Sequence, residues 1–190
     1  MNQIPKKLDR YYYDWMQLPE EAKDLDDADQ KLRLRWVASH CLGDVLDVGG
    51  SAGYLAKYIN CSRYVLLDLA LQRVKFSRQL GVEYRVHGCG EALPFKTASF
   101  RSVVLAEVLE HVPFPALLLK EAARVGEKVI VTVPDEYGGM QHGFGTPGAH
   151  VRRYTEETLR AEVESAGLII EEWQHLKGER MAWWCLVAKR

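Results

Sequence analysis

The chain has 190 residues, 47% of them hydrophobic, and its 25 basic and 26 acidic side chains leave a formal net charge of −1. This length and composition fit one globular domain, and the balanced charge argues against broad attraction to nucleic acid or membrane surfaces. No apolar run approaches the ~20 residues of a membrane span or resembles a signal peptide. Four widely spaced cysteines favour neither a zinc knuckle nor a disulfide framework. We therefore expect a cytoplasmic protein without a membrane span.

Residues 1–43 differ from the rest of the chain. They contain the aromatic stretch YYYDW, the acidic stretch EEAKDLDDAD and the run QKLRLRWVASHC, which is typical of an amphipathic helix. One interpretation packs this segment against the sheet edge, and the other makes it a lid over a ligand because of its clustered aromatic residues. We treat residues 1–43 as an N-terminal helical and aromatic extension of a main domain at 44–190.

From residue 44 onward, short apolar runs alternate with helix-like segments. Five runs rich in valine and leucine suit parallel strands that are buried on both faces: 44–48, 63–68, 82–86, 102–106 and 128–133. Between them, a helix over residues 71–80 is predicted to stop at Gly81, and another to open at Pro115. This alternation predicts a Rossmann-like, doubly wound α/β sheet.

The last third of the chain changes its pattern. Thr155 is a predicted cap of a helix that Gly167 ends, and two strand-like runs follow, joined by the turn KGER. We therefore expect a mostly parallel, seven-stranded sheet that finishes with a C-terminal antiparallel hairpin.

The stretch VLDVGGSAGY, residues 45–54, places small residues directly after the first predicted strand. It is not a dinucleotide fingerprint, because Ser51 and Tyr54 occupy glycine positions, and no Gly-Lys-Ser/Thr of a P-loop follows. Asp47, at the strand's end, would repel a pyrophosphate but attract a cation or an ammonium group. The sequence therefore predicts a ligand that carries no phosphate at this loop.

These residues resemble a known family, the class I S-adenosylmethionine-dependent methyltransferases, and within it the small methionine-biosynthesis-like and ubiquinone-biosynthesis-like group. VLDVGGSAG is similar to the family's first motif, acid-x-Gly-x-Gly-x-Gly, with Ser51 in place of the middle glycine. GCGEALPF (88–95) and SFRSVVLAEVLEHV (99–112) resemble later motifs of the family, in the same order. The resemblance covers residues 44–190 and implies a methyltransferase domain with S-adenosyl-L-methionine as its cofactor.

The resemblance also implies roles for individual residues. Asp68 is expected to accept hydrogen bonds from both ribose hydroxyls, and Glu107 to hold the cofactor's ammonium group. Cys89 stands where the family usually has an aspartate that meets the adenine amino group. The expected cofactor-binding residues are Asp47, Gly49, Gly50, Ser51, Gly53, Asp68, Leu69, Cys89, Gly90, Glu91 and Glu107.

Methyl transfer needs an oriented, deprotonated acceptor more than covalent catalysis. His111 in EVLEHV is a candidate general base, although the alternative is a structural histidine at a helix start, and His150 is a second catalytic candidate. The glycine-rich loop 137–150 is expected to face the substrate. We expect a methyltransferase that is directed at oxygen and acts on a small metabolite or a lipid- or sugar-linked intermediate.

Two other functions stay open at this stage. Glu107, Glu110 and His111, with His142 or His150, resemble the metal-binding run of small-RNA ribose 2′-O-methyltransferases. The other alternative is a non-catalytic S-adenosylmethionine-binding protein. We expect no nucleic-acid partner and no metal, because Glu107 can hold the ammonium group and Glu110 can begin the next helix. The methyl acceptor and the oligomeric state are left open.

Overall fold

The computed structural model describes residues 27–137 and 150–190. Within these ranges the chain forms one seven-stranded sheet in the order β3-β2-β1-β4-β5-β7-β6. All neighbouring strands are parallel except those that pair with β7. The strands are β1 (Asp44–Val48), β2 (Arg63–Asp68), β3 (Tyr84–His87), β4 (Phe100–Ala106), β5 (Gly126–Pro134), β6 (Ile169–Lys177) and β7 (Ala182–Lys189). The predicted Rossmann-like architecture with an antiparallel C-terminal hairpin is confirmed.

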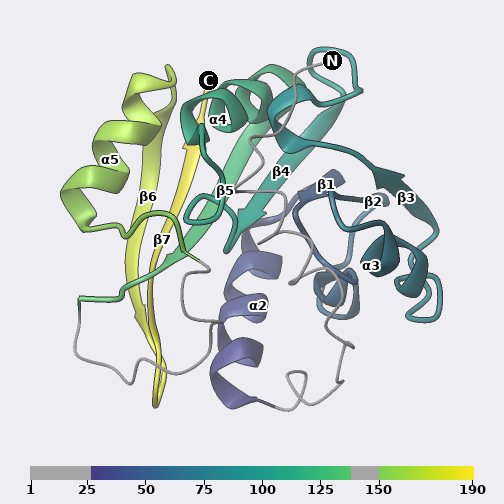
Figure 1. Ribbon diagram of the computed structural model, residues 1–190, viewed down its shortest axis with the longest axis horizontal. Helices are drawn as coiled ribbons and strands as arrows, with labels where there is room; N and C mark the ends of the chain where they lie inside the picture. The colour runs from purple at the N-terminus through teal and green to yellow at the C-terminus, as the bar shows by residue number, and fades with distance from the viewer. Residues whose placement is uncertain (1–26, 138–149) are drawn as a thin grey trace.

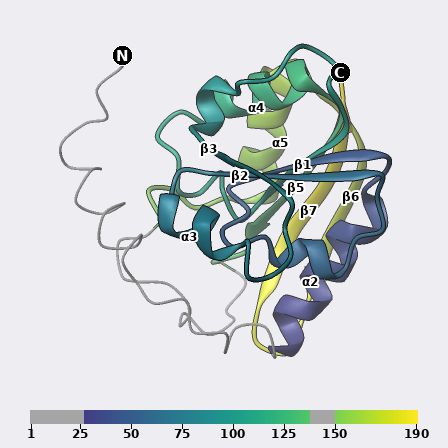
Figure 2. The ribbon, with the colours of Figure 1, turned by 90° about the vertical axis from the view of Figure 1, so that its right-hand side faces the viewer.

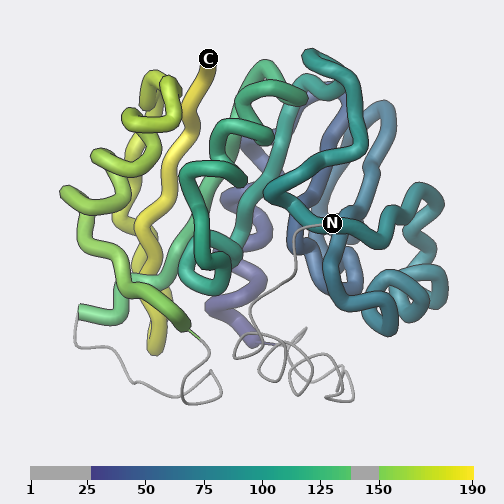
Figure 3. The backbone as a smooth tube through the Cα atoms, turned by 45° about the horizontal axis from the view of Figure 1, so that its top comes forward, coloured from purple at the N-terminus to yellow at the C-terminus, as the bar shows by residue number. Residues whose placement is uncertain are grey.

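Helices cover both faces of this sheet (Figure 1). In Figure 2, α4 and α5 lie on one side of the strands and α2 on the other. Figure 3 shows α4 and α5 next to each other, in agreement with the contacts between them. The helical segments are α2 (Ala28–His40), α3 (Leu71–Phe76), α4 (Pro115–Val125) and α5 (Glu156–Ser165), with short 3₁₀ turns η2 (Tyr54–Lys57) and η3 (Gly90–Ala92).

Alternating side chains of the strands divide the core into two apolar clusters. Leu46 of β1 packs with Leu118 of α4 and Leu159 of α5 on one face. Its neighbour Val45 packs with Trp36 of α2 and Trp183 of β7 on the other face. Buried on both faces, the central strands need the near-continuous apolar runs that the sequence shows.

The strand order reverses direction between β1 and β4, which are neighbours although β2 and β3 separate them in sequence. In open α/β sheets, ligands bind outside the carboxyl ends of the strands at such a switch point. The loop after β1, the end of β2 and the turn after β4 all lie at this edge. The topology therefore brings the predicted site residues to one place.

Several predicted boundaries differ from the structure: β4 and β5 begin two residues earlier than predicted, and larger differences lie around Gly81. The helix expected over residues 71–80 ends at Phe76, and the chain continues in tight turns, with the Leu80 N–H bonded to the Ser77 carbonyl oxygen. Gly81 has a positive φ of 83° at the end of these turns. The third strand begins at Tyr84 and not at Val82, because the Val82 N–H is bonded to the Ser77 carbonyl oxygen.

Helix α2 is fixed to the far hairpin by a buried carboxylate. Asp29, 2% exposed, accepts hydrogen bonds from the backbone N–H groups of Glu179 and Arg180, both at 2.8 Å, and of Met181 at 2.9 Å. A Cβ atom on Gly178 would lie 2.3 Å from Oδ1 of Asp29, so the turn needs a glycine there. Residues 27–40 therefore pack as part of the domain.

The lid hypothesis concerns residues 1–43, and the loop 137–150 is expected to face the substrate. Residues 1–26 and 138–149, including His142, lie outside the described residues. Among the helices of the described ranges, none has the length and apolar composition that crossing a membrane requires.

Candidate functional site

The loop after β1 is packed tightly against the protein. Gly49 has a positive φ of 72°, and a Cβ atom there would lie 2.7 Å from Cγ2 of Val108, in the turn after β4. A Cβ atom on Gly50 would lie 2.3 Å from Oδ2 of Asp47. Gly53, with φ of 80°, precedes η2. The small residues of this loop are therefore required by packing inside the protein.

Asp47 lies beneath this loop and is 3% exposed. The hydroxyl of Tyr64, on the neighbouring strand β2, donates a hydrogen bond to Oδ2 of Asp47. Burial raises the pKa of the Asp47 carboxyl to about 6, while the bond from Tyr64 opposes this shift. The carboxyl group thus supports the loop from below, and the structure does not present it as a surface charge that attracts a ligand.

Asp68 ends β2 and joins two segments of the site. Its Oδ2 accepts a hydrogen bond from the Ser51 N–H at 2.8 Å, and its Oδ1 accepts one from the Ala70 N–H at 2.7 Å. Ser51 itself has a positive φ of 57°, and its hydroxyl accepts a hydrogen bond from the Arg73 guanidinium. These bonds hold the loop after β1 against the end of β2, and they place a carboxylate at the switch point.

The segment after β3 forms the next side of the site. The Gly88 N–H bonds to the Asp68 carbonyl oxygen, and the Leu69 carbonyl oxygen contacts Nε2 of His87 at 2.9 Å. Cys89 is exposed, and Gly90 opens η3 with no room for a side chain, since a Cβ atom would lie 2.7 Å from Leu118. The Phe114 N–H donates to the carboxylate of Glu91 at 3.3 Å.

Glu107 follows β4 with a positive φ of 59°, which is uncommon for a residue with a side chain. Its Oε1 accepts a hydrogen bond from the Thr132 hydroxyl at 3.1 Å, and its Oε2 accepts one from the Trp183 indole at 3.0 Å. Nη1 of Arg33 lies 3.5 Å from the same Thr132 hydroxyl. Glu107 is therefore tied to β5 and β7 by partners that the sequence did not indicate, and Arg33 of α2 contacts one of these partners.

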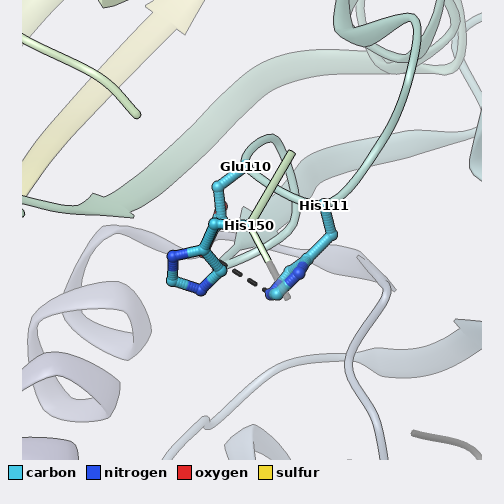
Figure 4. A group of neighbouring side chains, drawn as sticks. All are labelled: Glu110, His111 and His150. Atoms are coloured by element: carbon cyan, nitrogen blue, oxygen red, sulfur yellow. Dashed lines mark ion pairs between the residues drawn. The ribbon is translucent and has the colours of Figure 1, made fainter. Parts of the chain in front are cut away.

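Three further side chains converge at the same edge (Figure 4). The ligand atoms of Glu110, His111 and His150 lie within 4.8 Å of one another. The two imidazole rings meet edge to face, with their centroids 4.8 Å apart, and Oε1 of Glu110 is 3.9 Å from Nε2 of His111. The Val151 N–H bonds to the Glu110 carbonyl oxygen at 2.9 Å, which brings His150 next to the turn after β4.

Glu110 does not begin the next helix, contrary to the expectation from the sequence. Helix α4 starts at Pro115, and the Glu110 side chain points into the protein with 1% of its surface exposed. Among the described residues, neither of its carboxylate oxygens finds a hydrogen-bond partner. Burial raises the pKa of the Glu110 carboxyl well above its usual range, and the nearby charge of Glu107 raises it further.

Glu136 is a residue of this region that the sequence analysis missed. Its Oε1 lies 2.7 Å from Nδ1 of His150, and its Oε2 lies 3.2 Å from Nε of Arg153. It lies two residues after the end of β5, at the carboxyl end of a parallel strand, and this position could have identified it from the sequence. Tyr64 could not be recognised in this way, because it lies within β2. Its contact with Asp47 depends on the register between β2 and β1.

Comparison with known proteins agrees with this geometry. A family model described as a methyltransferase domain matches residues 46–128. The ubiquinone biosynthesis O-methyltransferase of Xanthomonas oryzae pv. oryzae (strain PXO99A) is 35% identical over 89 residues, which are 43% of this chain and 37% of that protein. The protein of the same name from Xylella fastidiosa (strain 9a5c) is 32% identical over 89 residues. The matched region thus spans little more than a third of these curated relatives.

Solved structures match over most of the chain. A SAM-dependent methyltransferase from Thermotoga maritima has a TM-score of 0.73 at 19% identity, covering 94% of this chain and 99% of its own. A SAM-dependent methyltransferase from Leishmania major has a TM-score of 0.78 at 9% identity, covering 96% of this chain and 82% of its own. At such identities the likeness establishes the fold. Together with the methyltransferase-domain match over residues 46–128, these findings support an S-adenosylmethionine-dependent methyltransferase.

Proposed function

We propose that this protein transfers a methyl group from S-adenosyl-L-methionine to a hydroxyl oxygen of a small molecule or of a lipid- or sugar-linked intermediate. The observation that carries the proposal is the bond from the Ser51 N–H to the Asp68 carboxylate at the switch point of the sheet. This bond joins the glycine-containing loop to Asp68, whose carboxylate can accept hydrogen bonds from the two hydroxyl groups of a ribose. Nothing in this arrangement resembles a lysine-bearing phosphate cradle, in accord with a cofactor that has no phosphate.

The residues of the loop fit this cofactor. A carboxylate has about four lone-pair sites, so Asp68 can hold the backbone and also accept from ribose hydroxyls. Gly49 and Gly50 keep the loop free of side chains beside that carboxylate, and Leu69, Cys89, Gly90 and Glu91 form the expected side toward the adenine. Glu107 is the proposed partner of the cofactor's ammonium group, and hydrogen bonds from Thr132 and Trp183 orient its carboxylate.

S-adenosyl-L-methionine held by these residues would supply an electrophilic methyl group, and the carbon–sulfur bond would break, with its electron pair left on sulfur, as the acceptor oxygen bonds to that carbon. The protein's task is then to align the acceptor and remove its proton. Nδ1 of His150 lies 2.7 Å from the Glu136 carboxylate. A proton on Nδ1 leaves the lone pair on Nε2, which can accept the hydroxyl proton. His111, whose ring meets that of His150, lines the same position.

The relatives favour an O-directed reaction on a small molecule over the two alternatives. Both curated relatives bear the name of O-methyltransferases of ubiquinone biosynthesis. A purely cofactor-binding protein would have no need for a histidine held by a carboxylate at the edge where an acceptor arrives. The ribose 2′-O-methyltransferase hypothesis gains no support from these names.

The experiment has a binding arm and a turnover arm. Calorimetry on the full chain should show binding of S-adenosylhomocysteine and no comparable binding of NAD or ATP. Incubation with methyl-labelled cofactor and pools of hydroxylated metabolites, lipids and RNA should label a compound in the first two pools. His150→Gln should lower the labelling rate by about 10²–10⁴-fold while cofactor affinity stays unchanged. Comparable binding of NAD, or labelling confined to RNA, would contradict the proposal.

A further inference from the structure

We propose that Arg73 is a positioning residue for the cofactor, which acts through the Ser51 hydroxyl to hold the Asp68 carboxylate in the orientation that a ribose diol requires. The Arg73 guanidinium donates a hydrogen bond to that hydroxyl, and the Ser51 N–H donates one to Oδ2 of Asp68 at 2.8 Å. Arg73 lies in α3 and Ser51 in the loop after β1, so the bond joins two elements at the switch point of the sheet. This role rests on the proposed function, because it belongs to the same cofactor site.

The first argument is that these contacts form a closed ring around Asp68. Its Oδ1 accepts a hydrogen bond from the Ala70 N–H at 2.7 Å, and the Arg73 N–H bonds to the Ala70 carbonyl oxygen at 3.0 Å. From this turn of α3 the Arg73 side chain returns to Ser51, whose N–H binds the other oxygen of the same carboxylate. Because Asp68 is 4% exposed, protein contacts and not solvent orient its carboxylate.

The second argument is the backbone of Ser51. Its φ of 57° lies in the left-handed region that favours glycine, so the conformation is strained for a serine. Strained conformations of this kind persist where the surrounding contacts hold them, and they cluster at functional sites. The bond from Arg73 to the hydroxyl is a contact that a glycine could not make. A serine at this position therefore gives the loop an anchor on α3.

The remaining acceptor sites of Asp68 show why its orientation matters. A carboxylate has about four lone-pair sites, which are shared between its two oxygens. The Ser51 and Ala70 N–H groups each occupy a site on a different oxygen, which leaves a site on each oxygen for the two ribose hydroxyls. A shift of the loop or a rotation of the carboxylate would misalign these sites.

Arg73 therefore affects ribose recognition without contact with the ribose. Its bond to Ser51 fixes the loop before the ligand arrives, which lowers the cost of ordering the site on binding. The measurable consequence is the preference of the protein for a ribose over a deoxyribose. This preference reports on the alignment of the Asp68 carboxylate, whereas a general packing defect would weaken both ligands alike.

The test compares two ligands by calorimetry on the full chain: S-adenosylhomocysteine and its 2′-deoxy analogue. The unmodified chain should bind the first at least about 10-fold more tightly, because a hydrogen bond to a charged group is lost with the hydroxyl. Arg73→Ala should remove most of this preference, and Arg73→Lys, which keeps a cationic donor, should restore part of it. Arg78→Ala, which removes an exposed arginine from the turns after α3, is the matched control and should leave the preference unchanged.

A double-mutant cycle tests whether Arg73 acts through Ser51. Ser51→Ala removes the hydroxyl and keeps a side chain on the same backbone, so it should lower the preference as Arg73→Ala does. The double variant should lose no more than either single variant, because both changes delete one bond. If Arg73→Ala does not fold, Arg73→Lys and Ser51→Ala provide the same comparison.

Three results would overturn the role of Arg73: equal affinity of the unmodified chain for the two ligands, an unchanged preference in Arg73→Ala, or additive losses in the double variant. No binding of S-adenosylhomocysteine by the unmodified chain would overturn both this role and the proposed function. If the preferences change as expected but no methyl transfer to oxygen is found, the role of Arg73 stands and the proposed function fails.

Discussion

Asp47 and Asp68 are the same residue type at the ends of adjacent strands, and their surroundings give them different tasks. Asp68 accepts hydrogen bonds from two backbone N–H groups, which favour its charged form. Asp47 is buried with a single hydroxyl donor, and its pKa is raised to about 6. We therefore assign ligand recognition to Asp68 and support of the loop to Asp47.

The first prediction concerns Asp68. Asp68→Asn removes the charge but keeps one acceptor oxygen, and losing a charge-assisted hydrogen bond costs roughly 1.5–3 kcal/mol, or about one to two decades of affinity. S-adenosylhomocysteine binding, measured by calorimetry, should weaken by that factor. Asp44→Asn, at the opposite end of β1 in an ion pair with Arg63, is the matched control and should leave affinity unchanged. Equal affinity in both variants would remove Asp68 from the cofactor site.

The second prediction concerns pH and Asp47. Because its folded-state pKa is raised from 3.8 to about 6, the native state holds a proton between these values that the unfolded chain has lost. Stability from this group is present below pH 4 and is lost as pH rises through 6. The Asp47→Asn variant has no such loss. The difference in free energy of unfolding, variant minus unmodified chain, should therefore increase by up to roughly 3 kcal/mol from pH 4 to pH 7. Urea unfolding at both pH values measures it, and a pH-independent difference would contradict the assignment.

At the scale of elements, the loop after β1 connects three strands. Its Gly49 N–H bonds to the Leu67 carbonyl oxygen of β2, while the Gly49 Cα faces Val108 in the turn after β4. The glycine pattern that identifies the loop in the sequence thus reflects packing between elements as well as access for the ligand.

The third prediction separates these two demands on glycine. Gly81 has φ of 83° with nothing within 4 Å of a Cβ atom, so Gly81→Ala should cost only the strain of a left-handed backbone, about 1–2 kcal/mol. Gly49→Ala adds a contact of 2.7 Å with Val108 to a similar strain. It should therefore lower the free energy of unfolding by more and also weaken cofactor binding, which Gly81→Ala leaves intact. Thermal melts and calorimetry on both variants decide this, and equal losses would contradict it.

At the scale of the whole molecule, Asp29 joins the first described helix to the last hairpin across 150 residues of chain. Its three backbone partners are all in the turn between β6 and β7. The hairpin in turn places Trp183 beside Glu107 at the carboxyl edge of the sheet. The C-terminal hairpin therefore helps to shape the site although it carries no predicted site residue.

The fourth prediction tests this connection. Asp29→Ala leaves three backbone N–H groups without their charged acceptor, and it should lower the free energy of unfolding by at least about 3 kcal/mol. Asp44→Ala, which breaks an exposed ion pair with Arg63, should cost no more than about 1 kcal/mol. Chemical denaturation with urea measures both. A cost at Asp29 as small as that at Asp44 would show that the hairpin is held by its apolar contacts alone.

The sequence by itself determined the strand–helix alternation, the C-terminal hairpin and the resemblance of the loop after β1 to a methyltransferase motif. Each of these is a local pattern of apolar spacing, caps and glycines. It also placed Asp68, since an acid at a strand's end stays at the carboxyl edge of any parallel sheet. Its helix and strand boundaries around Gly81 were wrong, because turn hydrogen bonds to Ser77 compete there with both elements.

Only the tertiary structure decided the burial of Asp47 under Gly50 and the partners of Glu107 on β5 and β7. These features depend on strand register and on contacts between distant segments, so no local pattern encodes them. The same holds for Glu110, for which the sequence suggested a helix start: its burial follows from the turn after β4 folding into the core. Burial, unlike periodicity, is a property of the whole packed chain.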